Sequence, residues 1–180
     1  RYELAYRSLT SLLANTPRDQ YRLTVCVDGR PGPSYLGLES LIENDADYTL
    51  MSRENQGLGP TINGAISNIC SVNEWYDHPS HGDSSKVAPF IVMCQDDLLY
   101  NPHWLQTLTT GFLAFEKMEN LGFASGVECI EHPMRKQLTK SHITKDWIRA
   151  AQMFGRREYW KSLMPIPRFD PETGRMRAKP

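Results

Sequence analysis

The chain has 180 residues, of which 40% are hydrophobic and 23% are charged, a composition typical of a globular protein with one domain. No apolar run approaches the roughly 20 residues that a membrane helix needs, and residues 1–15 lack the continuous apolar stretch of a signal peptide. The four cysteines form no C-x-x-C pair, which favours free thiols in a reducing compartment over a zinc site. We therefore expect a cytoplasmic protein without a transmembrane segment.

Helices and strands are expected to alternate along the chain. Apolar residues at helical spacing predict helices over residues 2–15, 35–44, 60–72 and 102–119, with a further helix around 145–154. Short β-compatible runs predict strands over residues 21–27, 47–52, 90–97 and 121–127. This alternation predicts an α/β protein, a three-layer sandwich around a mostly parallel sheet.

The run FIVMCQDDLLYNPHWL, residues 90–105, ends a predicted strand on two adjacent carboxylates, Asp96 and Asp97. Mg²⁺ and Mn²⁺ prefer one or two carboxylates together with phosphate oxygens of a substrate. The alternative is that one acid caps the next helix, but Asn101 stands directly before Pro102 and is better placed as the N-cap. The acid pair is therefore predicted to bind a divalent cation.

Two other predicted strands also end in loops that contain glycine. Asp28 precedes Gly29 after the first strand, although Asp-Gly alone is a common turn. The loop RENQGLGP, which begins at Arg53, places two glycines before a helix and lets a phosphate or ribose approach the backbone. Ligands of parallel α/β sheets bind outside the carboxyl ends of the strands. We therefore expect both loops and the acid pair to lie on one edge of one sheet.

Neither the dinucleotide pattern G-x-G-x-x-G nor the phosphate-loop pattern G-x-x-x-x-G-K-[ST] is present. Instead, residues 1–126 resemble glycosyltransferase family 2 and related inverting sugar-nucleotide transferases. LTVCVDG resembles the family's strand that ends in an Asp contacting the nucleotide base, matched by Asp28. ENQGLGPTIN resembles the family's N-x-G-x-x-x-A-x-N pattern, matched at Asn55, Gly57 and Asn63. The resemblance thus implies a nucleotide site at these residues, to which we add Arg53.

The segment QDDLLYNPHWL resembles the family's D-x-D metal motif, with Gln95 in place of the usual first acid. The resemblance implies that Asp97 binds the metal, Mn²⁺ or Mg²⁺, and that Asp96 lies near both the metal and the ribose. The implied fold is GT-A, the nucleotide-diphospho-sugar transferase fold, whose first strand would precede Arg1. The implied donor is a nucleotide-diphosphate sugar, for which we expect a UDP-sugar.

Charge divides the chain unevenly. Residues 1–132 carry 8 Lys and Arg against 17 Asp and Glu, whereas residues 133–180 carry 12 against 4. We interpret residues 1–132 as the nucleotide-sugar-binding core and residues 133–180 as a basic, acceptor-side segment of the same domain, cut from a longer chain. The acceptor hydroxyl would belong to a glycan, a phosphorylated molecule or a nucleic acid.

The resemblance implies an inverting glycosyltransferase whose catalytic base is an acid downstream of the metal motif. No segment matches the family's base, so Asp146 and Asp170 remain only fallback candidates. Two alternatives stay open. One is a nucleotidyltransferase of similar fold, and the other is a nucleotide-sugar-binding module that lacks a complete catalytic set.

Overall fold

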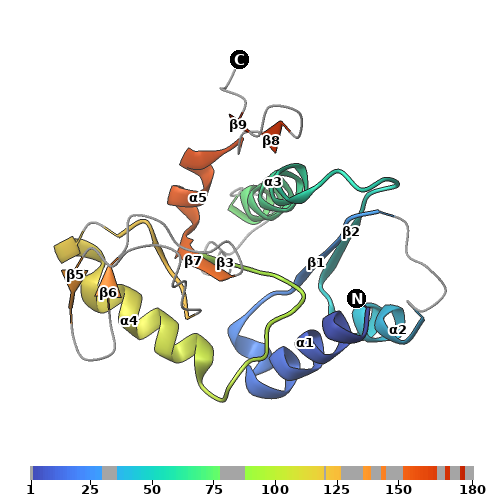
Figure 1. The fold of residues 1–180 in the computed structure, drawn as a ribbon, viewed down its shortest axis with the longest axis horizontal. Helices are drawn as coiled ribbons and strands as arrows, with labels where there is room; N and C mark the ends of the chain where they lie inside the picture. Colours follow the sequence, from blue (N-terminus) through green and yellow to red (C-terminus); the bar gives the residue numbers. More distant parts are fainter. Residues whose placement is uncertain are drawn as a thin grey trace. The chain divides into compact units, whose positions relative to one another are not determined.

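The structure, a computed structural model, describes residues 2–29, 36–77, 88–119, 121–126, 136–138, 143–144, 152–165, 169–170 and 175–176. These residues form a mixed α/β protein, as the sequence predicts (Figure 1). They divide into two compact units, and each is built from two stretches of chain. The first unit contains residues 3–20 and 89–159, and the second contains residues 21–88 and 160–180.

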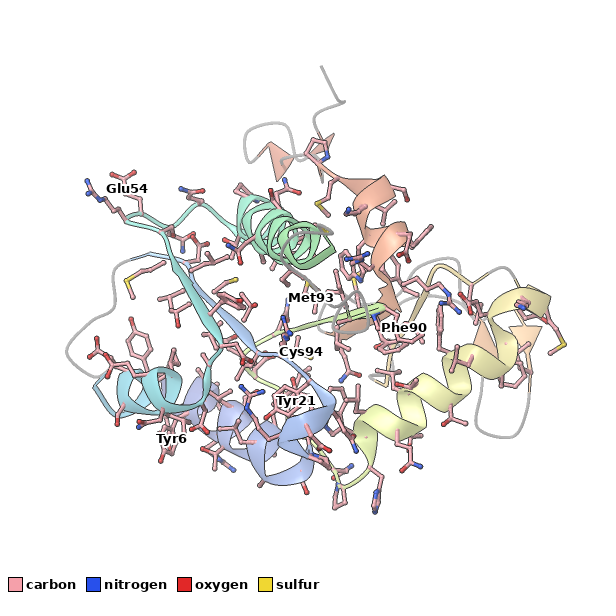
Figure 2. All side chains as sticks on the ribbon, turned by 180° about the vertical axis from the view of Figure 1, so that it is seen from behind. Tyr6, Tyr21, Glu54, Phe90, Met93 and Cys94 are labelled. Carbon is pink, nitrogen blue, oxygen red and sulfur yellow. The ribbon has the colours of Figure 1, made fainter. Side chains whose placement is uncertain are left out.

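The first unit has a three-stranded antiparallel sheet in the order β3-β7-β4. Its elements are α1 (Tyr2–Asn15), the 3-10 helix η1 (Arg18–Gln20), β3 (Phe90–Cys94), α4 (Trp104–Glu119), β4 (Phe123–Ala124), the pair β5 (Lys136–Gln137) and β6 (Ile143–Thr144), and β7 (Gln152–Arg156). Phe90 and Cys94 mark the two ends of β3 (Figure 2) and pair with Arg156 and Gln152 of β7. The central strand, β7, is therefore the last of the three in the sequence.

The core of this unit lies between the sheet and α4, which packs against β4 and β7. Leu108 and Phe112 stand four residues apart on α4, so both reach the sheet from one face of the helix. The ring of Phe154 stacks on Phe90 with 5.0 Å between ring centroids and meets Phe112 edge-on at 5.4 Å. Phe112 and Phe154 are almost completely buried, so this aromatic cluster fixes α4 against the sheet.

The second unit contains a parallel pair of strands, β1 (Thr24–Val27) and β2 (Tyr48–Met51), in register from Thr24 opposite Tyr48. Its helices are α2 (Leu36–Asp45) and α3 (Leu58–Asp77), and α3 packs against β1. Apolar side chains four residues apart are buried on both helices: Leu38, Ile42, Ile62, Ile66 and Cys70. The short strands β8 (Phe169–Asp170) and β9 (Arg175–Met176) pair antiparallel in the same unit, and α5 (Arg157–Leu163) continues directly from β7.

Two predictions about the architecture need correction. Among the described strands only β1 and β2 pair in parallel, and β3 belongs to a different, antiparallel sheet, so the expected mostly parallel sheet is not what these strands form. The helix expected around 145–154 is wrong at its end, because residues 152–154 lie in β7. Phe154 gains its burial there by entering the sheet between β3 and β4. Residues 145–151 lie outside the described part of the chain.

The remaining helices agree with the prediction from the sequence except at their ends. Helix α3 begins two residues before Pro60, and α4 begins two residues after Pro102. Within the described part of the chain, no helix has the length and apolarity to cross a lipid bilayer.

Candidate functional site

The acid pair lies in an exposed turn directly after β3, in the first unit. β3 ends at Cys94, and both Asp96 and Asp97 are exposed. Two carboxylates at a strand end are a suitable donor set for Mg²⁺ or Mn²⁺ when a substrate phosphate supplies further oxygens. Across the described residues, no three His, Cys, Asp or Glu side chains gather into a metal-binding group.

The following helix begins several residues after the acid pair. α4 begins at Trp104, and His103 precedes it with a φ of 63°, in the left-handed region. The carbonyl oxygen of Asn101 accepts the Trp104 N–H at 3.2 Å, and that of His103 accepts the Thr107 N–H at 2.9 Å. The prediction that Asn101 is the N-cap is therefore wrong by two residues, because the left-handed His103 delays the helix. Both acids lie well before the start of the helix, and their role as cation ligands stays a prediction.

Helix α1 holds the segment that follows the acid turn. The side chain of Asn15 donates from Nδ2 to the carbonyl oxygen of Tyr100 at 2.9 Å, and the Tyr100 N–H donates to Ser11 Oγ at 3.2 Å. Farther along, the indole N–H of Trp104 donates to Thr16 Oγ1 at 2.8 Å. These contacts were not predicted from the sequence. The available signal was the set of small polar residues Ser8, Ser11 and Asn15, which share one face of the predicted helix.

A buried polar cluster lies behind the turn. The Tyr100 side chain is only 6% exposed, and its hydroxyl hydrogen-bonds with Cys94 and Ser8. Burial raises the pKa of Tyr100 far above its usual value, and the adjacent Cys94 raises it further. Burial also raises the pKa of Cys94 to about 11, against a smaller lowering by Tyr100 and Gln152. Gln152 accepts the N–H of Gly126 at 2.9 Å, so the cluster joins the end of β3 to the segment after β4.

The second unit contains the glycine loop, and Asp28 organises it. The carboxylate follows β1 and accepts the N–H of Gln56 at 2.8 Å and the N–H of Gly57 at 2.9 Å. Its pKa is pulled upward by burial, but hydrogen bonds from Gln56, Ser52, Gly57 and Thr61 outweigh this effect and hold it below the usual value. A carboxylate has about four acceptor positions, so loop donors occupy most of them.

The loop backbone adopts a shape that its glycines permit. Gly29 has a φ of 100° and Gly57 a φ of 82°, in the region that residues with a Cβ avoid. The N–H of Gly29 donates to Ser52 Oγ at 2.9 Å, and a Cβ on Gly29 would lie 3.4 Å from the backbone nitrogen of Asn55. The side chain of Asn55 also accepts the Gly57 N–H at 3.0 Å. The loop is therefore fixed to the end of β1 from several directions.

The structure thus brings some predicted site residues together. Asp28, Asn55 and Gly57 share one hydrogen-bonded loop, in which Arg53 is exposed. Asn63 lies half-buried on α3, one and a half turns beyond Gly57.

The acid pair belongs to the other unit, where it follows an antiparallel strand, so the expected common sheet edge is not formed by the described strands. Of the two fallback bases, Asp146 lies outside the described residues, and Asp170 is described only as part of β8.

Comparisons of the chain with protein-family models, with curated proteins and with solved structures found no match. The chemistry of the two loops is therefore the basis for a functional interpretation. One loop presents paired carboxylates, and the other presents an ordered backbone before a helix N-terminus.

Proposed function

We propose that this chain is a metal-dependent, inverting glycosyltransferase that moves a sugar from a nucleotide-diphosphate donor to an acceptor hydroxyl. The observation that supports this most is the exposed pair Asp96 and Asp97, which closely follows β3 and precedes α4. The order of the sequence motifs supports it as well. The proposal includes the GT-A fold and a UDP-sugar as donor, both carried over from the resemblance.

The acid pair would contribute by holding Mn²⁺ or Mg²⁺. Departure of a nucleoside diphosphate builds negative charge on a phosphate oxygen, and a bound cation stabilises that charge. Asp97 would bind the cation, and Asp96 would lie close to it. Displacement in one step also needs a base that takes the proton of the acceptor hydroxyl. Asp146 and Asp170 remain the candidates for that role.

We assign the nucleotide to the glycine loop, with Asp28 in a supporting role. Because loop donors fill most of the acceptor positions of Asp28, its contribution would be to shape the loop rather than to read the base. The exposed side chain of Arg53 and the side-chain NH₂ group of Asn55 are the groups that would contact a ligand, and Gly57 would act with Asp28 in shaping the loop, because its N–H donates to Asp28 and Asn55. Asn63 is the last of the residues predicted to contact the nucleotide.

Replacing one acid tests the cation's role. Asp97→Asn should weaken Mn²⁺-dependent binding of UDP by tenfold or more, within the ~10-fold to 100-fold range typical of metal-site changes. The melting temperature should stay unchanged or rise, because the change removes one of two adjacent like charges. Calorimetric titration with and without Mn²⁺ measures this. Asp19→Asn, an exposed acid in η1 of the same unit, is the matched control. Equal UDP affinity with and without Mn²⁺ in the unmutated protein would contradict the proposal.

Product analysis separates the alternatives. A glycosyltransferase supplied with a sugar-labelled donor transfers the label to an acceptor and releases a nucleoside diphosphate. In a nucleotidyltransferase the acceptor attacks the α-phosphate of the donor, so the nucleoside monophosphate is transferred to the acceptor and the labelled sugar leaves as a sugar phosphate. Tight nucleotide binding without turnover on any acceptor would identify a binding module.

A further inference from the structure

The two acids lie in a short loop whose ends are held together. The loop comprises residues 95–99, between Cys94 at the end of β3 and Tyr100. Asp96 and Asp97 are exposed, and Leu99 is 67% exposed, whereas Tyr100 is buried. Because the Tyr100 side chain lies beside that of Cys94, the two ends of the loop come together at its base. The acids therefore project from a base that is anchored in the interior of the first unit.

Helix α1 adds a second attachment at the same end of the loop. Tyr100 satisfies both of its backbone groups with side chains of this one helix, since its N–H donates to Ser11 and its carbonyl oxygen accepts from Asn15. Asn15 and Ser11 also hydrogen-bond to the backbone of α1 itself, to Ser11 O at 3.0 Å and Ser8 O at 2.9 Å respectively. Their side chains are therefore fixed on the helix before they meet Tyr100.

These attachments matter for a cation site. Two neighbouring carboxylates repel each other, so an unrestrained loop would let them move apart. A loop whose ends are fixed restricts that movement before the ligand arrives, and binding then loses less conformational freedom. The effect acts on affinity without any contact between the helix and the ligand.

We propose that Asn15 and Ser11 are positioning residues of the acid turn, which hold Tyr100 so that Asp96 and Asp97 keep one arrangement ready for a divalent cation. This inference rests on the proposed function, because it assumes that the acid pair binds a cation. It adds a second region of the chain, α1, to the set of residues on which the site depends.

The chain supplies a matched control for Asn15. Asn44 on α2 donates from Nδ2 to the carbonyl oxygen of Ser40 at 2.7 Å, four residues earlier, as Asn15 does to Ser11. No hydrogen bond from Asn44 to a distant backbone is seen among the described residues, whereas Asn15 bonds to Tyr100. Asn15→Leu and Asn44→Leu therefore remove the same local bond, and only the first removes the attachment of the loop.

The experiment measures two quantities on the full chain: amide hydrogen exchange of residues 95–103, and Mn²⁺ affinity in the presence of UDP by electron paramagnetic resonance. Asn15→Leu should speed exchange in this segment and weaken Mn²⁺ binding by about tenfold, the lower end of the effect of residues that support metal ligands. Asn44→Leu should do neither. Ser11→Ala, a smaller change that removes the acceptor of the Tyr100 N–H, should act in the same direction and serves if Asn15→Leu does not fold.

Three outcomes would overturn the inference. Unchanged exchange in residues 95–103 would show that α1 does not restrain the loop. Faster exchange with unchanged Mn²⁺ affinity would show a purely structural attachment. In both cases the unmutated protein binds Mn²⁺ and the proposed function stands. Absence of Mn²⁺ binding to the unmutated protein would instead remove the proposed function, and the positioning role with it.

Discussion

Asp28 shows how a single carboxylate can hold a loop. It accepts the backbone N–H groups of Gln56 and Gly57 and lies 3.0 Å from the hydroxyl of Ser52. Asp28→Asn would place an amide NH₂ among donors and should lower the free energy of unfolding by about 1–2 kcal/mol, as expected for hydrogen bonds to a charged group that is partly open to solvent. Chemical denaturation at pH 7 measures this. An unchanged free energy of unfolding would show that the hydrogen bonds to the Asp28 carboxylate add no net stability, because water satisfies the same donors in the variant.

The same carboxylate makes stability depend on pH. Its pKa in the folded protein is held below its usual value, because loop hydrogen bonds outweigh burial. Stability from a depressed pKa is fully present above the unfolded-state value of about 4 and is lost as the pH falls through the lower folded-state pKa. The difference between the unmutated protein and Asp28→Asn should therefore be present at pH 7 and shrink below pH 4. Denaturation midpoints at several pH values measure it.

At the level of residues, the sequence predicted the positions of the acidic side chains relative to the strands better than it predicted their hydrogen-bond partners. Asp28, Asp96 and Asp97 follow strands as predicted, because a strand followed by an acid and a turn is a local pattern. The partners of Asp28 could not be predicted, because two of them are backbone N–H groups, which every residue except proline carries. The partners of Tyr100 could not be predicted either. Its backbone groups hydrogen-bond to the side chains of Asn15 and Ser11, which are 85 and 89 residues away in the sequence.

Among the elements, α4 and β7 are joined at the surface by an ion pair. Arg156 donates to Glu116 through Nε and through Nη2, the latter at 2.8 Å, and its guanidinium lies 5.2 Å from the ring centroid of Phe90. The hydrogen bond from Arg156 lowers the pKa of Glu116, and Glu116 raises the pKa of Arg156. The side chain of Glu116 is 17% exposed and that of Arg156 is 41% exposed, so solvent weakens their attraction. The pair aligns the helix with the strand more than it stabilises the fold.

A double-mutant cycle with Glu116→Gln and Arg156→Gln should give a coupling energy of about 0.5–1 kcal/mol, near the upper range for surface pairs because the contact is bidentate. The coupling should decrease in 1 M NaCl, where the screening length is about 3 Å. The control cycle uses Arg157 and Glu158, which lie 3.8 Å apart with Glu158 69% exposed, and should give a value near zero. A coupling that salt does not change would point to packing rather than charge.

The element that the sequence predicted least well is β7. Its residues, QMFGR, carry no alternation that distinguishes a strand from the end of a helix, and Phe154 suits either. Pairing decides the outcome, because β3 and β4 leave a central position between them that β7 fills. Gly155 fits there, since a Cβ would lie 2.8 Å from the carbonyl oxygen of Gly122. The elements α1, α2 and β1, by contrast, have local patterns that are sufficient to predict them.

On the scale of the whole molecule, the chain passes from one unit to the other several times, so each unit joins distant segments. The alternating order of helices and strands predicts the α/β class, but pairing partners depend on contacts that no local pattern encodes. Parallel and antiparallel pairs of this protein are therefore not distinguishable from the sequence.

This organisation predicts a long-range effect of removing α1. A chain that begins at Pro17 should lose amide-exchange protection in residues 98–104, because the hydrogen bonds from Ser11, Asn15 and Thr16 are removed. Each net hydrogen bond of about 1 kcal/mol corresponds to roughly a fivefold faster exchange. Hydrogen exchange with mass spectrometry measures this by peptide. Protection lost only in residues 21–29, next to the cut, would contradict the assignment of α1 to the first unit.

Burial of Cys94 at the end of β3 also determines the redox character of this part of the molecule, because it raises the thiol pKa more than Tyr100 and Gln152 lower it. With a pKa of about 11, the Cys94 thiol is present as thiolate in only about one molecule in 10⁴ at pH 7, and the thiolate is the form that reacts with oxidants and alkylating reagents. Cys94 therefore resists oxidation while the loop is closed. Opening of the loop would expose the thiol and return it to an ordinary pKa, so the rate of its alkylation records how often the loop that carries the acid pair opens.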